Sequence, residues 1–207
     1  MAPNPCRYDR PGTPTRPWAW LATVILCLGL APTAAVGADG ETRDDVIAVL
    51  HTDLGDFTLR LFPDSAPMAC ENFTTHARNG YYDGVVFHRV VEDFMIQTGD
   101  PDGTGYGGRS IWGDSFGNEI DPARGFDRPG VLAMANRATE NTNDSQFFIT
   151  LVPTPWLNGR YTIFGEVVEG MDVVQALGDL DVNPTTDRPI RDVRIESITL
   201  GSPGTGE

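Results

Sequence analysis

Two short runs near residue 50 are rich in the apolar and β-branched residues that are typical of β-strands. Residues 46–52 have the sequence VIAVLHT, and residues 57–62 have the sequence FTLRLF, in which Phe57, Leu59 and Leu61 alternate with Thr58 and Arg60. A strand with this period buries one face. The four residues between the runs, DLGD, are typical of a turn. The pattern therefore predicts a β-hairpin.

A helical period follows the hairpin. Pro67 stands where a helix would begin, and proline is favoured in the first turn because the N–H that it lacks would have no partner there. Apolar residues then recur at spacings of four, three and four, from Ala66 through Cys70 and Phe73 to Ala77, before an Asn-Gly pair. This stripe predicts a helix that turns Cys70 toward the core.

Five further β-like runs, separated by Gly and Pro, lie between residues 81 and 168: VVFHRV, DFMIQTG, GVLAMAN, SQFFITL and YTIFGEVV. A second helix is predicted over Glu169–Gly178 and a closing strand over Arg191–Leu200. Seven or eight strands with two short helices, and no regular alternation of strand and helix, indicate an all-β antiparallel barrel or sandwich.

The first 38 residues differ from the rest. Three Arg and one Asp precede a fourteen-residue uncharged run, Trp18 to Ala31, and small residues end the segment at Ala38. This order predicts a secretory signal over 1–38, followed by a linker over 39–45, a folded domain over 46–200 and a disordered tail over 201–207. An uncleaved membrane anchor and a wrongly assigned start codon are the alternatives.

Composition narrows the possible chemistry. The 207 residues include 29 acidic and 15 basic residues, for a formal net charge of −14, which argues against nucleic acid as a partner. Every basic residue is Arg, so mechanisms that need a Lys are excluded. Without the first 38 residues only Cys70 remains, so neither an internal disulfide nor a structural zinc site is expected.

One glycine-rich stretch matches a known pattern without its context. Residues 103–108, GTGYGG, fit the G-x-G-x-x-G spacing of dinucleotide sites, but no helical stripe follows them. The glycines are better explained by a surface loop that turns tightly or passes close to a ligand.

Polar residues interrupt two strongly apolar segments, 87–100 and 134–150. Arg89 lies among Phe87, Val90 and Val91, and glutamines stand at 97 and 146. From the pattern alone, each could simply satisfy a buried backbone group.

With these segments the chain resembles the cyclophilin family of peptidyl-prolyl cis–trans isomerases, in a bacterial exported form. The strings that carry the resemblance are LFPDSAPMACENF, YYDGVVFHRVVEDFMIQTGDPDGTGYGGRSIWG, NTNDSQFFIT and WLNGRYTIFGEV, within residues 46–200. The resemblance implies an eight-stranded antiparallel closed β-barrel capped by two α-helices. It also implies a monomer that needs no cofactor or metal and acts on proline-containing polypeptides.

The resemblance assigns a site residue by residue. The catalytic arginine falls on Arg89, and the other positions, all substrate-binding, fall on Phe94, Met95, Gln97, Ala135, Asn136, Gln146, Phe148, Trp156, Leu157 and Tyr161. Strand parity supports one part independently, because Gln146 and Phe148 share a face that Phe147 does not. Parity also implies that no regular strand begins before Met95 if both Phe94 and Met95 line the pocket.

Two departures from the family pattern concern binding rather than catalysis. Tyr161 stands where many members carry a His, and the stretch Arg137–Glu140 is one residue longer than the common eukaryotic form and lacks its small residues. Sensitivity to cyclosporin and preference for the residue before proline therefore cannot be carried over.

Three functions stay open at this point. The first is an isomerase that assists the folding of exported proteins in the periplasm or outside the cell, free of the membrane once the leader is cleaved. The second is a chaperone-like binding module whose turnover is incidental. The third is a membrane-tethered scaffold, which requires a retained leader.

Cleavage after Ala38 is the first testable prediction. The order of charge, apolar run and small residues predicts a product that begins at Asp39. Intact-mass measurement of the protein expressed in a bacterial host checks this, and a membrane-bound product that retains residues 18–31 contradicts it.

A second prediction concerns salt. Cleavage would leave a formal net charge of −16 on 169 residues, because the leader carries three Arg and one Asp. Mutual repulsion of these charges is screened at ionic strengths of about 0.1–1 M. An acidic surface with Arg in place of Lys fits adaptation to a saline medium, while solubility and the base composition of the genome are the alternative explanations. We expect the Tm of the cleaved protein to rise with NaCl in this range; a flat or falling curve would remove the saline interpretation.

Overall fold

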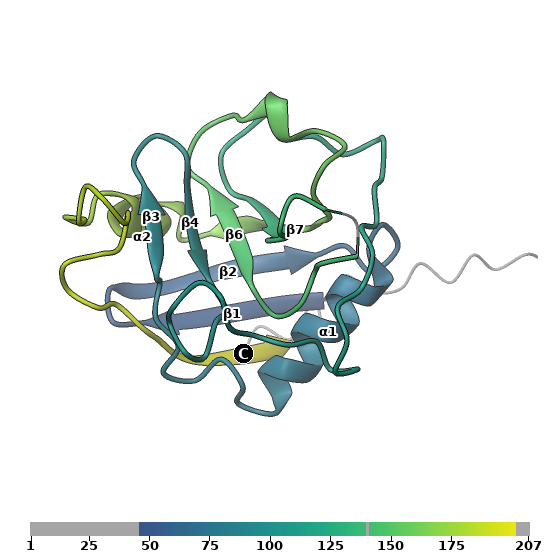
Figure 1. Ribbon diagram of the computed structural model, residues 1–207, viewed down its shortest axis with the longest axis horizontal. Coiled ribbons are helices and arrows are strands. Elements are labelled where there is room, and N and C mark those ends of the chain that lie inside the picture. Colours follow the sequence, from purple (N-terminus) through teal and green to yellow (C-terminus); the bar gives the residue numbers. More distant parts are fainter. Residues whose placement is uncertain (1–45, 140, 202–207) are drawn as a thin grey trace, which may run out of the picture. The chain divides into compact units, whose positions relative to one another are not determined.

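The computed structural model describes residues 46–139 and 141–201, and the predicted leader, the linker and residues 202–207 lie outside them. Among the described residues, no helix has the length and apolar character needed to cross a membrane. The elements, in chain order, are β1 (Val46–Thr52), β2 (Gly55–Leu61), α1 (Pro67–Arg78), β3 (Arg89–Val91), β4 (Met95–Thr98), β5 (Val131–Met134), β6 (Phe147–Thr150), the 3-10 helix η1 (Pro155–Leu157), β7 (Ile163–Glu169), α2 (Met171–Gly178) and β8 (Ile195–Gly201) (Figure 1).

The predicted hairpin and both predicted helices are present. β1 and β2 pair antiparallel from Val46–Leu61 to Thr52–Gly55. The apolar stripe of α1 is buried, and burial of Cys70 raises the pKa of its thiol to about 12, as expected for a core residue. The second helix begins at Met171 rather than Glu169, because β7 continues through Glu169.

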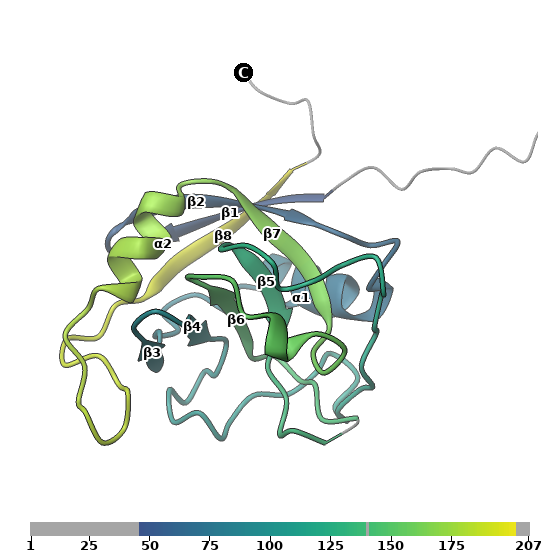
Figure 2. The ribbon, with the colours of Figure 1, turned by 90° about the horizontal axis from the view of Figure 1, so that it is seen from above.

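The eight strands form one antiparallel sheet in the order β3-β4-β6-β5-β7-β2-β1-β8. The sheet curls so that α1 and α2 lie at opposite ends of it (Figures 1 and 2). The predicted closed barrel is corrected to an open curled sheet, because the edge strands β3 and β8 do not pair. The irregular segment before β3 lies between them, joined to the segment before β8 by an isolated Val86–Arg194 bridge.

The central strands are buried on both faces. Alternate residues of β4, β5 and β6, such as Ile96, Leu132 and Phe147, belong to the main core inside the curl. Their neighbours on the opposite face form a second apolar cluster with residues from the loops that cover it: Phe62, Met95, Phe126, Val131, Ala133, Phe148, Leu157 and Ile163. Burial on both sides explains why VLAM and FFIT contain no polar alternation.

Phe147 provides a test of the buried core described above. Its ring is fully buried and makes edge contacts with Phe73 and Tyr82 at centroid distances of 5.4 and 5.5 Å. Phe147→Ala should lower the free energy of unfolding by about 3–5 kcal/mol in urea titrations, because it opens a cavity in the core. Ile190→Ala, at a residue that is 76% exposed, should change it by less than about 0.5 kcal/mol. Equal effects of the two substitutions would contradict the placement of Phe147 in the core.

Candidate active site

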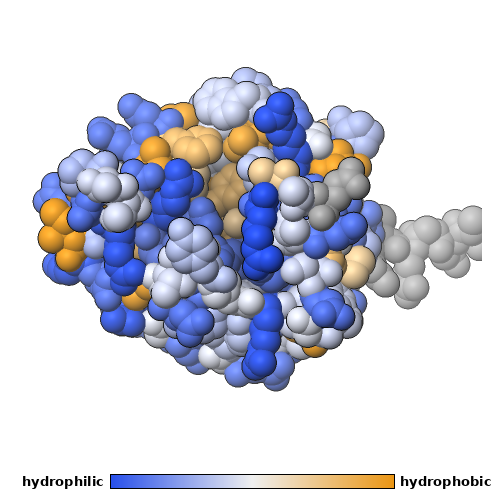
Figure 3. Space-filling model, viewed as in Figure 1, coloured by the Kyte–Doolittle hydropathy of each residue, from blue (hydrophilic) through white to orange (hydrophobic). Residues whose placement is uncertain are grey.

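The candidate site lies on the outer face of four neighbouring strands. Register places Arg89 of β3 opposite Gln97 of β4, Gln97 opposite Phe148 of β6, and Phe148 opposite Ala133 of β5. Residues opposite one another in antiparallel strands share a face, so the guanidinium, the amide and the ring all project to the same side. Figure 3 shows an apolar hollow over β4 and β6, with hydrophilic residues around it.

A cavity of about 150 Å³ occupies this face. All the residues that line it were predicted from the sequence: Arg89, Phe94, Met95, Gln97, Ala135, Asn136, Phe148, Leu157 and Tyr161. Two predicted residues, Gln146 and Trp156, do not line it. The cavity has apolar walls and a polar edge, which is the usual character of a small-ligand site.

The end of a turn allows both Phe94 and Met95 to line the cavity. β4 begins at Met95, and Phe94 still belongs to the preceding turn, where its N–H donates to the carbonyl of Val91 at 3.1 Å. Asp93 in the same turn has a φ of 55°. The strand therefore starts where the parity argument required, and adjacent residues can face one cavity because only one of them is in the strand.

Two aromatic rings hold the ring of Phe148 in place. Phe126 lies parallel to it at a centroid distance of 6.0 Å, and Tyr161 meets it edge-on at 5.5 Å. Sequence analysis missed Phe126 because it stands in an irregular loop with no periodicity. An isolated aromatic residue between Gly125 and Asp127 was the one available signal.

Arg89 is anchored at one nitrogen. Its Nε donates to Oδ2 of Asp187 at 3.3 Å, and both side chains are 41% exposed. No hydrogen bond to its two terminal nitrogens is found within the described residues, so they remain available to a ligand. Asp187, whose φ is 54°, is held against β3 because its carbonyl accepts the N–H of Val90. No sequence pattern could reveal this partner, which lies 98 residues away.

The imidazole next to Arg89 adds no competing charge. His88 is buried, and burial lowers its pKa below the ordinary value. It is therefore neutral at pH 7.

Gln146 lies behind Gln97 rather than in the cavity. Its Oε1 accepts the Nε2–H of Gln97 at 2.8 Å. It lines a smaller cavity of about 70 Å³, which shares Gln97, Ala135 and Asn136 with the first. Gln146 is therefore connected to the first cavity by its hydrogen bond with Gln97.

Asn136 is already engaged with neighbouring loops. Its Nδ2 donates to the Arg160 carbonyl at 3.1 Å and to Asn118 Oδ1 at 3.3 Å, and its Oδ1 accepts the N–H of Ala138 at 2.9 Å. A ligand that used this amide would have to replace one of these bonds. The side chain braces the wall of the cavity.

Trp156 lies at the rim. It is 58% exposed in η1 and stacks on Phe94 at a centroid distance of 6.2 Å. It extends the apolar wall outward instead of lining the cavity.

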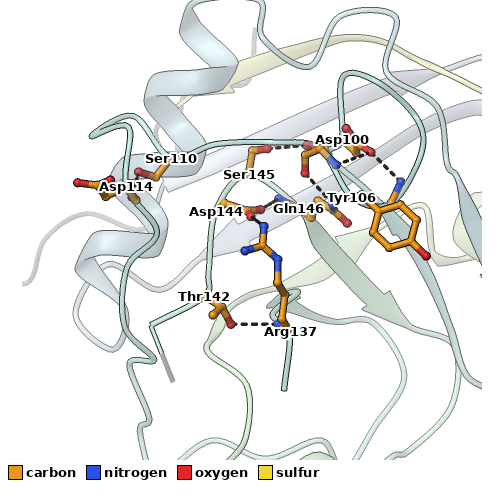
Figure 4. Close-up of polar contacts among 12 residues, drawn as sticks. Asp100, Tyr106, Ser110, Asp114, Arg137, Thr142, Asp144, Ser145 and Gln146 are labelled. Carbon is orange, nitrogen blue, oxygen red and sulfur yellow. Dashed lines mark hydrogen bonds and ion pairs between the residues drawn. The ribbon is translucent and has the colours of Figure 1, made fainter. Parts of the chain in front are cut away.

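The loop that departs from the family pattern is tied down by an ion pair. The Arg137 guanidinium lies 3.4 Å from the Asp144 carboxylate, as Figure 4 shows. Burial raises the pKa of Asp144, although the Gln146 N–H and the Arg137 guanidinium both oppose the rise. In the described part of the chain, no three His, Cys, Asp or Glu side chains are grouped so that they could hold a metal ion.

Comparison with known proteins agrees with this geometry. The chain matches the family model described as "Cyclophilin type peptidyl-prolyl cis-trans isomerase/CLD" over residues 47–200. It is 53% identical over 167 residues to "Peptidylprolyl isomerase domain and WD repeat-containing protein 1" of Mus musculus, which covers 81% of this chain but only 26% of that protein. "Peptidyl-prolyl cis-trans isomerase-like 1" of Aspergillus fumigatus is 52% identical over 147 residues, covering 71% of this chain and 90% of its own.

Solved structures give the same result. A cyclophilin type peptidyl-prolyl cis-trans isomerase of Cryptosporidium parvum superposes with a TM-score of 0.74 at 39% identity, covering 77% of this chain and 98% of its own. A structure of the same protein in the presence of the dipeptide Ala-Pro gives a TM-score of 0.73. These relatives are eukaryotic, so the expected bacterial exported form is not confirmed. The fold, the composition of the cavity and these similarities together show that the chain belongs to the cyclophilin-type peptidyl-prolyl cis-trans isomerase family.

Proposed function

We propose that this protein catalyses the cis–trans isomerisation of X–Pro peptide bonds, with Arg89 as the catalytic residue. The observation that carries the proposal is the position of Arg89 at the edge of an apolar cavity, where Asp187 holds its Nε and no described residue bonds to its two terminal nitrogens. The chain spans about a quarter of the length of its Mus musculus relative, so its substrates are part of the proposal as well.

The reaction needs stabilisation of a twisted bond, and no covalent chemistry. Amide resonance gives the X–Pro bond a barrier of about 18–20 kcal/mol, and uncatalysed exchange takes about 10–100 s. Exchange near a millisecond requires about 10⁴–10⁵-fold acceleration, or about 5.5–7 kcal/mol. A site without a nucleophile can supply this by binding the transition state more tightly than the ground state.

Arg89 can make that distinction. The prolyl nitrogen becomes a hydrogen-bond acceptor only when the twist breaks conjugation, so a guanidinium N–H placed beside it stabilises the transition state selectively. One charge-assisted hydrogen bond contributes about 1.5–3 kcal/mol. The remainder comes from restraint, in which Phe94, Met95, Phe148 and Leu157 hold the ring while Gln97 holds the peptide on one side of the bond.

We further propose that the clients are exported polypeptides with exposed proline-containing segments. The support is the order of charge, apolar run and small residues in the first 38 residues. In this proposal the protein works as a monomer in the periplasm or outside the cell, or on the membrane if the leader is retained.

A chaperone-like binding module is the second candidate. The observation that favours it is the exposed Trp156 beside Phe94, which widens the apolar surface beyond what a proline ring needs. A pure binding module does not require Arg89, so the two candidates differ in what removal of this residue does.

Arg89→Ala should lower the isomerisation rate by roughly 10–10³-fold, because it removes a preorganised charged donor worth about 1.5–4 kcal/mol. Arg89→Lys should restore little, since an ammonium lacks the planar fork of the guanidinium. The measurement is the cis–trans exchange rate of an Ala-Pro peptide by NMR, with circular dichroism to confirm the fold.

Two comparison variants make this test specific. Arg78→Ala, at an exposed arginine that ends α1 outside the cavity, should leave the exchange rate unchanged. Phe148→Ala should raise KM as well as lower kcat, because it removes part of the wall and no charge. A folded Arg89→Ala protein with a nearly normal exchange rate would favour the binding module.

A further inference from the structure

A buried carboxylate next to the candidate site holds a glycine-rich loop by direct hydrogen bonds. Asp100 is fully buried and follows β4 closely. Its Oδ2 accepts the N–H groups of Thr104, Gly105 and Gly107 at 2.9, 2.7 and 3.2 Å and the Thr104 hydroxyl at 3.0 Å. Its Oδ1 accepts the N–H of Asp102 at 2.9 Å. Figure 4 shows Asp100 beside Gln146.

These contacts keep the carboxylate charged in the interior. Burial alone would raise the pKa of Asp100, but the hydrogen bonds from Asp102, Thr104, Gly105 and Gly107 outweigh it and lower the pKa below the ordinary value. A carboxylate that accepts several backbone N–H bonds is stable as the anion. The loop therefore depends on a negative charge at this position at every pH near neutrality.

Gly107 makes the close approach possible. A Cβ at this position would lie 2.2 Å from Asp100 Oδ1 and 2.7 Å from Asp102 Oδ2. The conflict is purely steric, because the φ of Gly107 is not in the left-handed region. Residue 107 must therefore lack a side chain if the loop is to lie against the carboxylate.

The same glycine contacts the active-site amides through its carbonyl. Gln146 Nε2 donates to the Gly107 carbonyl at 2.8 Å, and Gln146 Oε1 accepts from Gln97 Nε2 at 2.8 Å. A carbonyl oxygen can only accept, so Gly107 fixes which end of the Gln146 amide faces it. The other end must then accept from Gln97, which fixes the amide orientation of Gln97 as well.

We propose that Asp100 is a positioning residue, whose carboxylate holds the Gly107 carbonyl where it orients the amides of Gln146 and then Gln97 in the cavity. The proposal rests on the proposed isomerase function for its kinetic consequence, but the orientation of the amides can be tested without activity. It gives the glycine-rich stretch 103–108 a role in the site, and it assigns Gln146, which does not line the cavity, the part of orienting Gln97.

A double-mutant cycle tests whether Asp100 and Gln146 act on Gln97 through the same chain of hydrogen bonds, which we call the relay. Asp100→Asn keeps the shape but removes the charge and replaces one acceptor by a donor. Gln146→Met keeps the volume but removes both the donor and the acceptor of the side-chain amide. Each should lower kcat/KM by about 3- to 30-fold, as expected for one or two lost hydrogen bonds. The double variant should lie within about twofold of the more impaired single variant, because a relay that is already broken cannot be broken again.

Gly107→Ala provides a second route if Asp100→Asn does not fold. It leaves the carboxylate in the chain and displaces the loop by steric conflict alone, and it should lower kcat/KM in the same range. Gly201→Ala is the matched control, because a Cβ there meets no atom of the described residues within 4 Å and its φ is also unexceptional. Asp53→Asn controls for the loss of charge. Asp53 lies in the turn between β1 and β2, and its carboxylate likewise accepts a backbone N–H, that of Arg194 just before β8.

The side-chain amide resonances of Gln97 provide a readout independent of catalysis. In ¹⁵N-labelled protein they should shift in Asp100→Asn and in Gly107→Ala, and stay in place in both controls. Multiplicative losses in the cycle, or Gln97 resonances unchanged in folded Asp100→Asn, would overturn the relay. If the wild-type protein lacked isomerase activity, the resonances would still decide the relay, so the two proposals can fail separately.

Discussion

Burial of the central strands on both faces is the constraint on which the structure depends. In β6, Phe147 packs into the core while the next residue, Phe148, enters the second cluster that carries the cavity. Since side chains alternate along a strand, β6 contributes Phe147 and Ile149 to the main core and Phe148 to the second cluster. The wall formed by Met95 and Phe148 therefore has the rigidity of a packed core, because these buried side chains cannot move without disturbing the sheet.

The candidate catalytic group is held without being neutralised. Asp187 contacts Arg89 at a single nitrogen, and both side chains are partly exposed to water. An ion pair of this kind contributes little stability, about 0–1 kcal/mol. Its role here is to orient the Arg89 guanidinium. It directs Nε toward Asp187 and, in the proposed mechanism, leaves the terminal nitrogens for a group that becomes an acceptor only during rotation. Full burial of the pair would have consumed the same donors.

Local periodicity predicted much of this arrangement, and its limits are physical. The hairpin, the stripe of α1 and the separation of Phe147 from Phe148 follow from spacings within a few residues. The open edge between β3 and β8 does not, because it depends on an irregular segment, residues 84–87, whose backbone bonds to residues 193–195 more than 100 positions away. Asp187 and Phe126 were missed for the same reason. The residues that line the cavity came from family resemblance, which already contains such long-range information.

The glycine-rich stretch shows how one local pattern can serve different chemistry. In a dinucleotide site, glycines let backbone N–H groups approach a phosphate at a helix N-terminus. Here residues 104, 105 and 107 direct their N–H groups at Asp100, so the chain supplies its own anion. Buried contacts of this kind are screened by salt far less than surface charges are. A strongly acidic surface can therefore respond to the ionic medium while the loop beside the site keeps its geometry.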